Sequence, residues 1–377
     1  MSEWKKTYLR DLIVIKNGKD HKKLKNGQYP VYGSGGIMRY ADSYLYDQES
    51  VLLPRKGTLN NIQFVTEPFW TVDTCYYTVV NRDKVLPYFL YCCLCKMDIQ
   101  SLNTGSAVPS MTFEKYYSIE VPIPPLSTQH RIANILSRYD SLIENYQKQI
   151  KLLKEAAQRL YKEWFVDLRF PGHENTKIID GVPEGWKKKK AIDFFEMSIG
   201  KTPPRAEKQW FTDGKEGVPW VSISDMKDVT YLLQTSEGLT KEACEKHNVR
   251  IVDEGTVLLS FKLTVGRVSI AGMNVCTNEA IAHFNKNGDD WREYTLLYLR
   301  NYNFDTLGNT SGISKAVNST IVKNMPFLMP SGKVLDAFSN VAKPLFQKIK
   351  NLSSQLRLLT EARDRLLPKL MSGEIEI

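Results

Sequence analysis

An internal repeat constrains the fold of this chain more than any other feature of its 377 residues. When the sequence is aligned with itself at an offset of 206 residues, Val-Leu-Leu at 51–53 falls on the same tripeptide at 257–259, and Lys56 falls on Lys262. A repeated sequence normally folds as a repeated structural unit. We therefore expect two related halves with approximate two-fold symmetry.

The two halves agree most closely toward their ends, where residues 134–160 align with 340–366 without a gap. At their fronts, Trp4-Lys5-Lys6 matches Trp186-Lys187-Lys188 at an offset of 182, so the second half contains about 24 additional residues before Val257. The repeat predicts a front domain at 1–126, a helical segment with its linker at 127–180, a second front domain at 181–332 and a second helical segment at 333–377.

The end of each half is predicted to be a long helix, because large side chains recur there in steps of three and four residues. These residues are Leu136, Tyr139, Ile143, Tyr146, Ile150, Leu153, Ala157, Leu160 and Trp164 in the first half, and Ala342, Leu345, Ile349, Leu352, Leu356, Leu359, Arg363, Leu366 and Leu370 in the second. Such spacing over four heptads is typical of a coiled coil. Arg363, which replaces Ala157, is expected to pair or to reach solvent at the edge of the seam.

Two arrangements of these helices are open. Each helix packs on its own domain, or the two helices pair with each other, and we favour the pair. Copies related by a two-fold axis would run antiparallel, as a rod of ~50 Å. The predicted helix and partner contacts are Ile143, Ile150, Leu153, Leu160, Ile349, Leu352, Leu356, Leu359 and Leu366. Ser127 or Thr128 is expected to cap the first helix.

The front domains are predicted to be α+β. Buried strands are expected at 51–53, 75–80 and 257–260, because these short runs are rich in β-branched and aromatic residues. Glycine and proline predict loops at 29–36 and 200–204. Helices are expected at 88–102 and 294–302, and they would cover one face of a sheet.

The net charge of +9 and the pI of about 9.0 favour a polyanionic partner such as nucleic acid. No apolar run is long enough to cross a bilayer, and the amino terminus lacks the apolar core of a signal peptide. We therefore expect a cytoplasmic protein that has no membrane partner.

The six cysteines, at positions 75, 92, 93, 95, 244 and 276, are scattered, which suggests reduced thiols. Cys92 and Cys95 form a C-x-x-C pair, but a zinc site needs a second pair of ligands. The second copy has Tyr298 and Asn301 at the equivalent positions. Small side chains in a buried helix face are therefore the favoured interpretation, and no metal site is predicted.

No known catalytic motif was found. The chain lacks both the glycine-rich cofactor loop and the Asn/Asp-Pro-Pro-aromatic loop that an amino-methyltransferase needs. Gly200-Lys201-Thr202 ends like a phosphate-binding loop, but Phe195 stands where its first glycine belongs. The five histidines are isolated from one another in the sequence. We expect a protein without a catalytic site.

Several stretches resemble the specificity subunits of type I restriction–modification systems. In the front domains these are residues 29–37, 51–57, 68–74, 217–225, 255–260 and 265–267; in the helical segments they are 124–132, 164–168 and 367–373. Their order, together with the repeat, covers the whole chain. The Pro-Pro…Gln connector at 124–129 is absent from the second copy, which has Pro330-Ser-Gly-Lys-Val334 and leaves the start of its helix open.

The resemblance implies two target-recognition domains, each of which reads one half of a split, asymmetric site in double-stranded DNA. The helices would set the spacer and dock two methyltransferase subunits, and restriction subunits would complete the complex. It also implies methylation at adenine N6. S-adenosylmethionine, ATP and Mg²⁺ would bind to the partners, and this chain would hold no cofactor.

Candidate DNA contacts lie in glycine-flanked loops, where the backbone can approach a ligand closely. They are Tyr32, Ser34, Arg39, Arg55 and Lys56 in the first domain, and Lys201, Arg205, Ser222, Lys262, Arg267 and Lys315 in the second. Each is otherwise a solvated charge or a turn residue, and Trp70 and Trp220 are expected to pack in the core. Two other functions are open: a specificity subunit whose partner fuses methylation with cleavage, and a coiled-coil scaffold that does not read DNA sequence.

Overall fold

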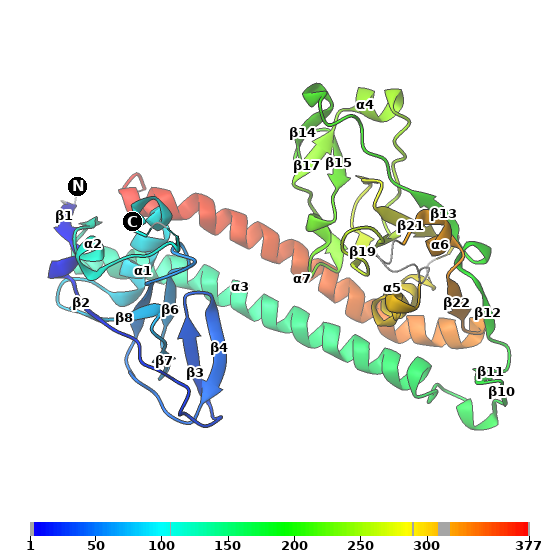
Figure 1. The fold of residues 1–377 in the computed structure, drawn as a ribbon, viewed down its shortest axis with the longest axis horizontal. Coiled ribbons are helices and arrows are strands. Elements are labelled where there is room, and N and C mark those ends of the chain that lie inside the picture. Colours follow the sequence, from blue (N-terminus) through cyan, green and yellow to red (C-terminus); the bar gives the residue numbers. More distant parts are fainter. Residues whose placement is uncertain (1–3, 106, 289, 308–316, 376–377) are drawn as a thin grey trace. The chain divides into compact units, whose positions relative to one another are not determined.

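The computed structural model describes residues 4–105, 107–288, 290–307 and 317–375. The chain folds into two compact units (Figure 1). Unit 1 comprises residues 1–144 and 358–377, and unit 2 comprises residues 145–357. Two long helices, α3 (Leu126–Tyr161) and α7 (Gly332–Ser372), each contribute residues to both units.

Unit 1 contains two sheets and a strand pair. The larger sheet has the order β2 (Ile13–Lys16), β8 (Cys75–Val80), β5 (Ser50–Pro54) and β6 (Gln63–Val65), and all its neighbours are antiparallel. The smaller sheet has the order β4 (Gly36–Ala41), β3 (Tyr29–Gly33) and β7 (Trp70–Thr71). Strands β1 (Lys5–Tyr8) and β9 (Glu120–Ile123) form the pair. Strand β5 is buried along its whole length and lies at the centre of the core.

The helices of unit 1 cover the larger sheet. Helix α1 (Pro87–Cys95) packs against β5 and β6, and it buries Phe89, Leu90 and Cys93. The predicted helix at 88–102 is interrupted after Cys95 and continues as a 3₁₀ turn, Ile99–Leu102, in which the side chain of Asp98 accepts the amide of Ser101. The short helix α2 (Phe113–Tyr117) is capped by Thr112 and leads into β9.

Unit 2 repeats this plan. Its larger sheet has the order β13 (Glu196–Ile199), β21 (Ile281–Asn285), β18 (Val257–Ser260), β19 (Val268–Ala271) and β16 (Tyr231–Leu232). Its smaller sheet has the order β14 (Phe211–Asp213), β17 (Glu237–Leu239), β15 (Val218–Val221) and β20 (Cys276–Thr277). Strands β12 (Lys187–Lys190) and β22 (Pro326–Met329) pair as β1 and β9 do, and helices α5 (Arg292–Asn301) and α6 (Ser319–Lys323) match α1 and α2. A two-strand hairpin, β10 (Ile178–Ile179) and β11 (Val182–Pro183), precedes β12.

The α+β class and the internal repeat are confirmed, as are the predicted strands at 51–53, 75–80 and 257–260. Much of the additional length of unit 2 lies between β15 and β18. That stretch contains β16, β17 and helix α4 (Lys241–Lys246). Strand β16 extends the larger sheet by pairing in parallel with β19.

Helices α3 and α7 pair in antiparallel orientation within each unit, as expected. In unit 1, Asp140 of α3 bonds to Arg363 of α7 at 3.0 Å. In unit 2, Ile150 of α3 packs with Ile349 and Leu352 of α7. Both helices also pack on the domains, since Leu136 and Leu370 belong to the core of unit 1, and Ala157 and Phe346 belong to that of unit 2. The two arrangements considered from sequence therefore occur together.

Several local predictions were wrong. Residues 29–33 form strand β3 and not a loop, although no helix or strand occupies 200–204, as predicted. Helix α3 begins at Leu126, so Ser127 and Thr128 lie within its first turn and do not cap it. The amides of Thr128 and Gln129 instead donate to the carbonyl oxygen of Pro125.

Gln129, the last residue of the Pro-Pro…Gln connector at 124–129, joins the start of α3 to the segment that precedes α1. Its buried side chain accepts the amide of Leu86 at 2.9 Å and donates to the carbonyl oxygens of Lys84 (3.0 Å) and Pro124 (2.9 Å). The residue 206 positions later is Leu335, which is buried in the apolar core of unit 2. The second copy therefore uses apolar packing where the first uses hydrogen bonds, and its helix begins at Gly332.

The cysteines are free thiols. Cys92 and Cys93 are buried in the core of unit 1, as predicted for small apolar side chains, whereas Cys95 is exposed. Among the described residues, no helix is both long and apolar enough to span a membrane. The described part of the chain also contains no group of three or more potential metal ligands.

Candidate nucleic-acid interface

Three loops of unit 1 meet beside its smaller sheet, and we call them loop cluster 1: residues 33–36, 55–61 and 72–74. The amide of Ser34 donates to Thr74 Oγ1 at 3.5 Å, and the side chain of Asn61 donates to the carbonyl oxygen of Ser34 at 2.8 Å. The amides of Arg55 and Lys56 both donate to the carbonyl oxygen of Thr74. The fold thus brings the predicted residues Ser34, Arg55 and Lys56 together.

The side chains of this cluster differ in their freedom to bind a ligand. Lys56 is exposed. The guanidinium of Arg55 is partly engaged within the protein, because it lies 3.4 Å from the carbonyl oxygen of Asp73 and 5.8 Å from the ring centroid of Tyr76. Tyr32 packs edge-on against Phe69, and burial raises the pKa of its phenol to about 12. Tyr32 is therefore a neutral, half-buried group at neutral pH.

Arg39 is not part of loop cluster 1. It lies on β4, and one of its Nη atoms donates to the carbonyl oxygen of Leu24 at 3.0 Å and to Asn26 Oδ1 at 3.1 Å. These bonds fix the loop that precedes β3. Arg39 therefore has a structural role, and only the remainder of its guanidinium is available to a ligand.

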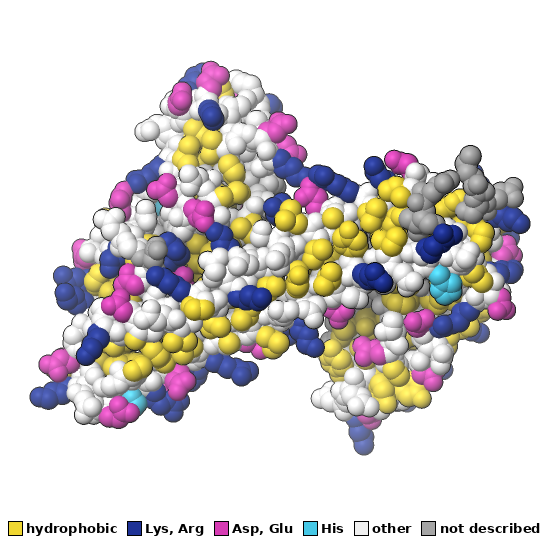
Figure 2. Space-filling model, turned by 180° about the vertical axis from the view of Figure 1, so that it is seen from behind, with side chains coloured by type: hydrophobic (Ala, Val, Ile, Leu, Met, Phe, Trp, Pro, Cys, Tyr) yellow, Lys and Arg dark blue, Asp and Glu magenta, His cyan; other side chains and the backbone are white. Residues whose placement is uncertain are grey.

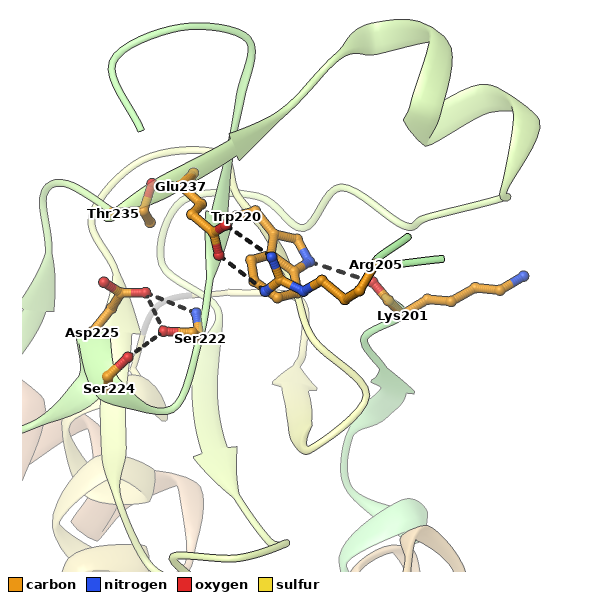
Figure 3. Close-up of polar contacts among 8 residues, drawn as sticks. All are labelled: Lys201, Arg205, Trp220, Ser222, Ser224, Asp225, Thr235 and Glu237. Atoms are coloured by element: carbon orange, nitrogen blue, oxygen red, sulfur yellow. Dashed lines mark hydrogen bonds and ion pairs between the residues drawn. The ribbon is translucent and has the colours of Figure 1, made fainter. Parts of the chain in front are cut away.

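Unit 2 builds the corresponding loop cluster 2 from residues 222–225, 261–267 and 278–280. Arg267 joins two of these loops, because its guanidinium donates to the carbonyl oxygen of Ile223 at 2.7 Å. Ser222 Oγ bonds to Asp225 Oδ2 and to Ser224 Oγ, both at 2.6 Å (Figure 3). Lys262 is exposed. The predicted residue Lys315 lies outside the described residues.

Arg205 is held tightly in the structure. It makes two hydrogen bonds to Glu237, at 2.8 and 2.9 Å, and its guanidinium lies 4.3 and 4.5 Å from the ring centroids of Phe211 and Trp220 (Figure 3). The side chain of Lys201, in contrast, is exposed and extends away from the other residues in the same view. Of the two, only Lys201 offers an unpaired charge.

The two clusters are equivalent in their backbone bonds. The amide of Val72 donates to the carbonyl oxygen of Tyr32 at 3.0 Å, and the amide of Asn278 donates to that of Val221 at 3.1 Å. Likewise the amide of Arg55 bonds to Thr74, and that of Phe261 to Ala280. The two units therefore share this arrangement of backbone hydrogen bonds, but the side chains attached to it differ.

Sequence reasoning missed Lys19, which is the counterpart of Lys201. The amide of Lys19 donates to the carbonyl oxygen of Thr71 at 2.8 Å, and that of Lys201 donates to Thr277 at 2.9 Å. Each lysine follows a glycine, Gly18 or Gly200. A Cβ atom at these glycines would lie 2.0 Å from the Val72 carbonyl oxygen and 2.2 Å from that of Asn278, so no other residue fits. The offset of 182 that aligns Trp4 with Trp186 also aligns these two Gly-Lys pairs.

A tryptophan holds each Gly-Lys pair in place. The indole of Trp70, on β7, donates to the carbonyl oxygen of Lys19 at 2.9 Å. The indole of Trp220, on β15, makes the same bond to Lys201 at 3.4 Å (Figure 3). Trp220 is buried, as expected for core packing, but Trp70 is only half-buried. The two units therefore reach the same contact from different strands.

The charge of the chain is not concentrated on one surface patch of the face drawn in Figure 2. There, Lys and Arg side chains lie among Asp and Glu side chains in both units. Any DNA surface on this face would depend on individual basic side chains and not on a continuous basic patch.

Comparison with known proteins agrees with this architecture. The family model described as the type I restriction modification DNA specificity domain matches residues 1–155 and again residues 183–351. The two matched ranges correspond to the two copies of the repeat. Together they cover most of the chain.

Relatives and a solved structure extend the comparison. The MjaIX specificity subunit of Methanocaldococcus jannaschii is 26% identical over 351 residues, which span 88% of this chain and 79% of the relative. The HindI specificity subunit of Haemophilus influenzae is 23% identical over 78% of this chain and 79% of the relative. The crystal structure of the S subunit of a type I restriction–modification system from M. genitalium superposes with a TM-score of 0.70, at 16% identity, over 98% of this chain and 96% of that one. The duplicated fold and the two matches to the family model show that this chain belongs to the type I restriction–modification DNA specificity family.

Proposed function

We propose that each unit of this specificity subunit reads one half of a bipartite site in double-stranded DNA. The observation that supports this most directly is the duplication of the loop cluster. The same backbone bonds recur in both units, while the side chains differ, with Arg55-Lys56-Gly57 in one and Phe261-Lys262-Leu263 in the other. A shared frame with different side chains suits two readers of different base sequences.

The division of labour among these residues follows from their chemistry. Lysine contacts to phosphate supply affinity that does not depend on sequence, whereas contacts to base edges supply the choice of sequence. Lys19, Lys56, Lys201 and Lys262 are the candidates for phosphate contacts. Linking two readers in one chain raises the effective concentration of the second reader once the first has bound.

We infer that the long helices α3 and α7 set the spacing between the half-sites and dock two methyltransferase subunits. Their described surfaces keep large apolar side chains exposed, namely Leu142 and Leu152 on α3 and Val341 and Leu358 on α7. Exposed apolar side chains on a well-paired helix suit a protein interface. On this proposal S-adenosylmethionine, ATP and Mg²⁺ bind to the methyltransferase and restriction subunits, this chain has no catalytic site, and the complex acts on DNA in the cytoplasm.

A binding experiment tests the proposal. The full chain, purified with its methyltransferase partner, is titrated with genomic fragments and with random duplexes over a range of salt concentrations. We expect a small set of genomic fragments to bind at least ~10³-fold more tightly than random DNA, with a steep dependence on salt. Equal affinity for all duplexes with a shallow salt dependence would instead indicate a scaffold that does not read sequence.

A further inference from the structure

Leu263 has an unusual position in loop cluster 2. It lies in the loop between β18 and β19, and 98% of its surface is exposed. Its φ angle is 58°, in the left-handed region that leucine rarely adopts. Leucine is unfavourable at this position for two reasons. Its backbone conformation is disfavoured, and its side chain gains no free energy from burial that would offset this.

The other non-glycine residues with positive φ among the described residues have ordinary explanations. Asp180, Asp228 and Asn248 belong to the residue types that tolerate this region. Leu168 packs against the core of unit 2, so burial offsets its backbone cost. Leu263 has neither explanation.

The repeat provides an internal comparison. The residue 206 positions before Leu263 is Gly57, whose φ is 89°. At this position unit 1 has glycine, which adopts a positive φ angle without strain, whereas unit 2 has leucine, which does not. The preceding residue is an exposed lysine in both units, Lys56 and Lys262. Leucine at 263 is thus specific to unit 2, and the backbone hydrogen bonds that the two units share do not require it.

The loop that carries Leu263 is firmly anchored. Ser260 Oγ donates to the carbonyl oxygen of Thr264 at 2.6 Å and accepts the amide of Arg267 at 3.0 Å. The amide of Gly266 bonds to the Ser260 carbonyl oxygen at 2.9 Å, and Phe261 is buried. The backbone of this loop is therefore held in place, while the apolar side chain of Leu263 is exposed. A side chain on such a loop can enter a ligand surface with little loss of conformational entropy.

We propose that Leu263 is a base-reading residue of unit 2, which contacts the C5-methyl group of a thymine in the major groove while Lys262 contacts a nearby phosphate. This proposal rests on the proposed function. Among groups on the major-groove edge of DNA, the thymine methyl is the apolar one, and apolar side chains recognise it. The neighbouring lysine supplies the charge that brings the loop to the backbone of the duplex.

The test replaces thymine by deoxyuridine, which removes only the methyl group. The tightest duplex selected from a random pool by the full chain with its methyltransferase partner is the probe. Deoxyuridine is placed in turn at each thymine of both strands. We expect one substitution, in one half-site, to weaken binding of the wild-type protein about fourfold, the factor that burial of one methyl group is worth. The variant Leu263→Gly should bind the thymine and deoxyuridine duplexes equally.

Leu263→Gly is chosen because glycine adopts the observed φ angle, so this variant should unfold no earlier than the wild-type protein in a thermal melt. Ile178→Ala, at an exposed isoleucine of β10 outside the proposed methyltransferase-docking surface, is the control and should keep the wild-type response to deoxyuridine. The proposal is overturned if no thymine is sensitive, or if Leu263→Gly keeps the wild-type response. It is also overturned if Ile178→Ala abolishes that response. If the wild-type protein does not distinguish the selected duplex from a scrambled one, the proposed function itself fails.

Discussion

At the scale of single residues, the two Gly-Lys pairs give the simplest prediction. We expect Lys19→Ala and Lys201→Ala each to weaken DNA binding equally for all sequences. Each should also reduce the slope of log affinity against log salt by about 0.9, the value of one lost phosphate contact. Salt titrations of both variants measure this slope, with exposed Lys177→Ala as the control. A changed sequence preference together with an unchanged slope would contradict the assignment to phosphate.

His283 gives a prediction about pH. It is buried between Ser198 Oγ (2.7 Å) and Thr277 Oγ1 (2.8 Å), and burial, with a smaller effect of Arg250, lowers the pKa of its imidazole to about 4. In the unfolded chain the pKa is about 6.5. Between these values the unfolded state binds a proton that the folded state does not, so stability falls as pH decreases from about 6.5 to about 4.

The loss should reach up to about 3 kcal/mol in the free energy of unfolding. Urea unfolding at a series of pH values measures it. In His283→Gln this contribution should be absent, and the variant should therefore show a shallower dependence on pH. Identical pH profiles of the two proteins would show that His283 does not titrate on unfolding in this range.

Prediction from sequence had a definite limit at this scale. Lys56 and Lys262 were proposed because they lie in glycine-flanked loops, and the offset of 206 aligns them. Lys19 matches Lys201 only at the separate offset of 182 and was missed. The φ angle and the full exposure of Leu263 are properties of the folded loop. The sequence Phe-Lys-Leu-Thr-Val alternates apolar and polar residues, which is typical of a half-buried strand, so nothing in its pattern marks the central leucine as exposed.

Among the secondary-structure elements, the paired helices α3 and α7 contain buried residues that should stabilise the fold and exposed residues that should bind the partner subunit. Ile349 is fully buried beside Ile150, so Ile349→Ala should cost about 2–5 kcal/mol in the free energy of unfolding. Leu358 is exposed on the same helix, so Leu358→Ala should unfold like the wild-type protein but weaken its complex with the methyltransferase. Chemical unfolding and size-exclusion chromatography of both variants test this. Equal effects of the two variants in both measurements would refute the distinction.

Gln129 gives a second prediction for α3. Gln129→Leu imitates Leu335 of the second copy but leaves the amide of Leu86 and the carbonyl oxygens of Lys84 and Pro124 unpaired. We expect a loss of about 1–3 kcal/mol in the free energy of unfolding. Leu335→Ala, which opens an apolar cavity in unit 2, is the matched change at the equivalent position. A neutral Gln129→Leu would mean that water replaces the lost bonds.

The elements also show where sequence patterns mislead. Heptad spacing predicted both long helices, because it reports the packing that stabilises them. Strand β3 was missed because Pro30 and Gly33 are typical of turns. Here pairing with β4 on one side and β7 on the other outweighs local preference.

At the scale of the whole molecule, the repeat in the sequence predicted the repeat in the structure, down to the insertion before Val257. The composition of each compact unit was not predictable in the same way. Unit 1 includes residues 358–377 from the far end of the chain, because the end of α7 packs beside the start of α3. The antiparallel pairing predicted from the repeat implies this contact, but no local sequence pattern shows where each helix passes from one unit to the other.

On the proposed function, the two units read separate halves of one site. The most direct measurement is a map of methylated adenines in cells that carry the wild-type chain, compared with cells in which residues 261–267 are replaced by a glycine-serine loop of equal length. We predict a split motif with a fixed gap for the wild-type chain, and a motif relaxed in one half only for the variant. A continuous motif, or a variant that changes both halves equally, would show that the two units do not read separate half-sites.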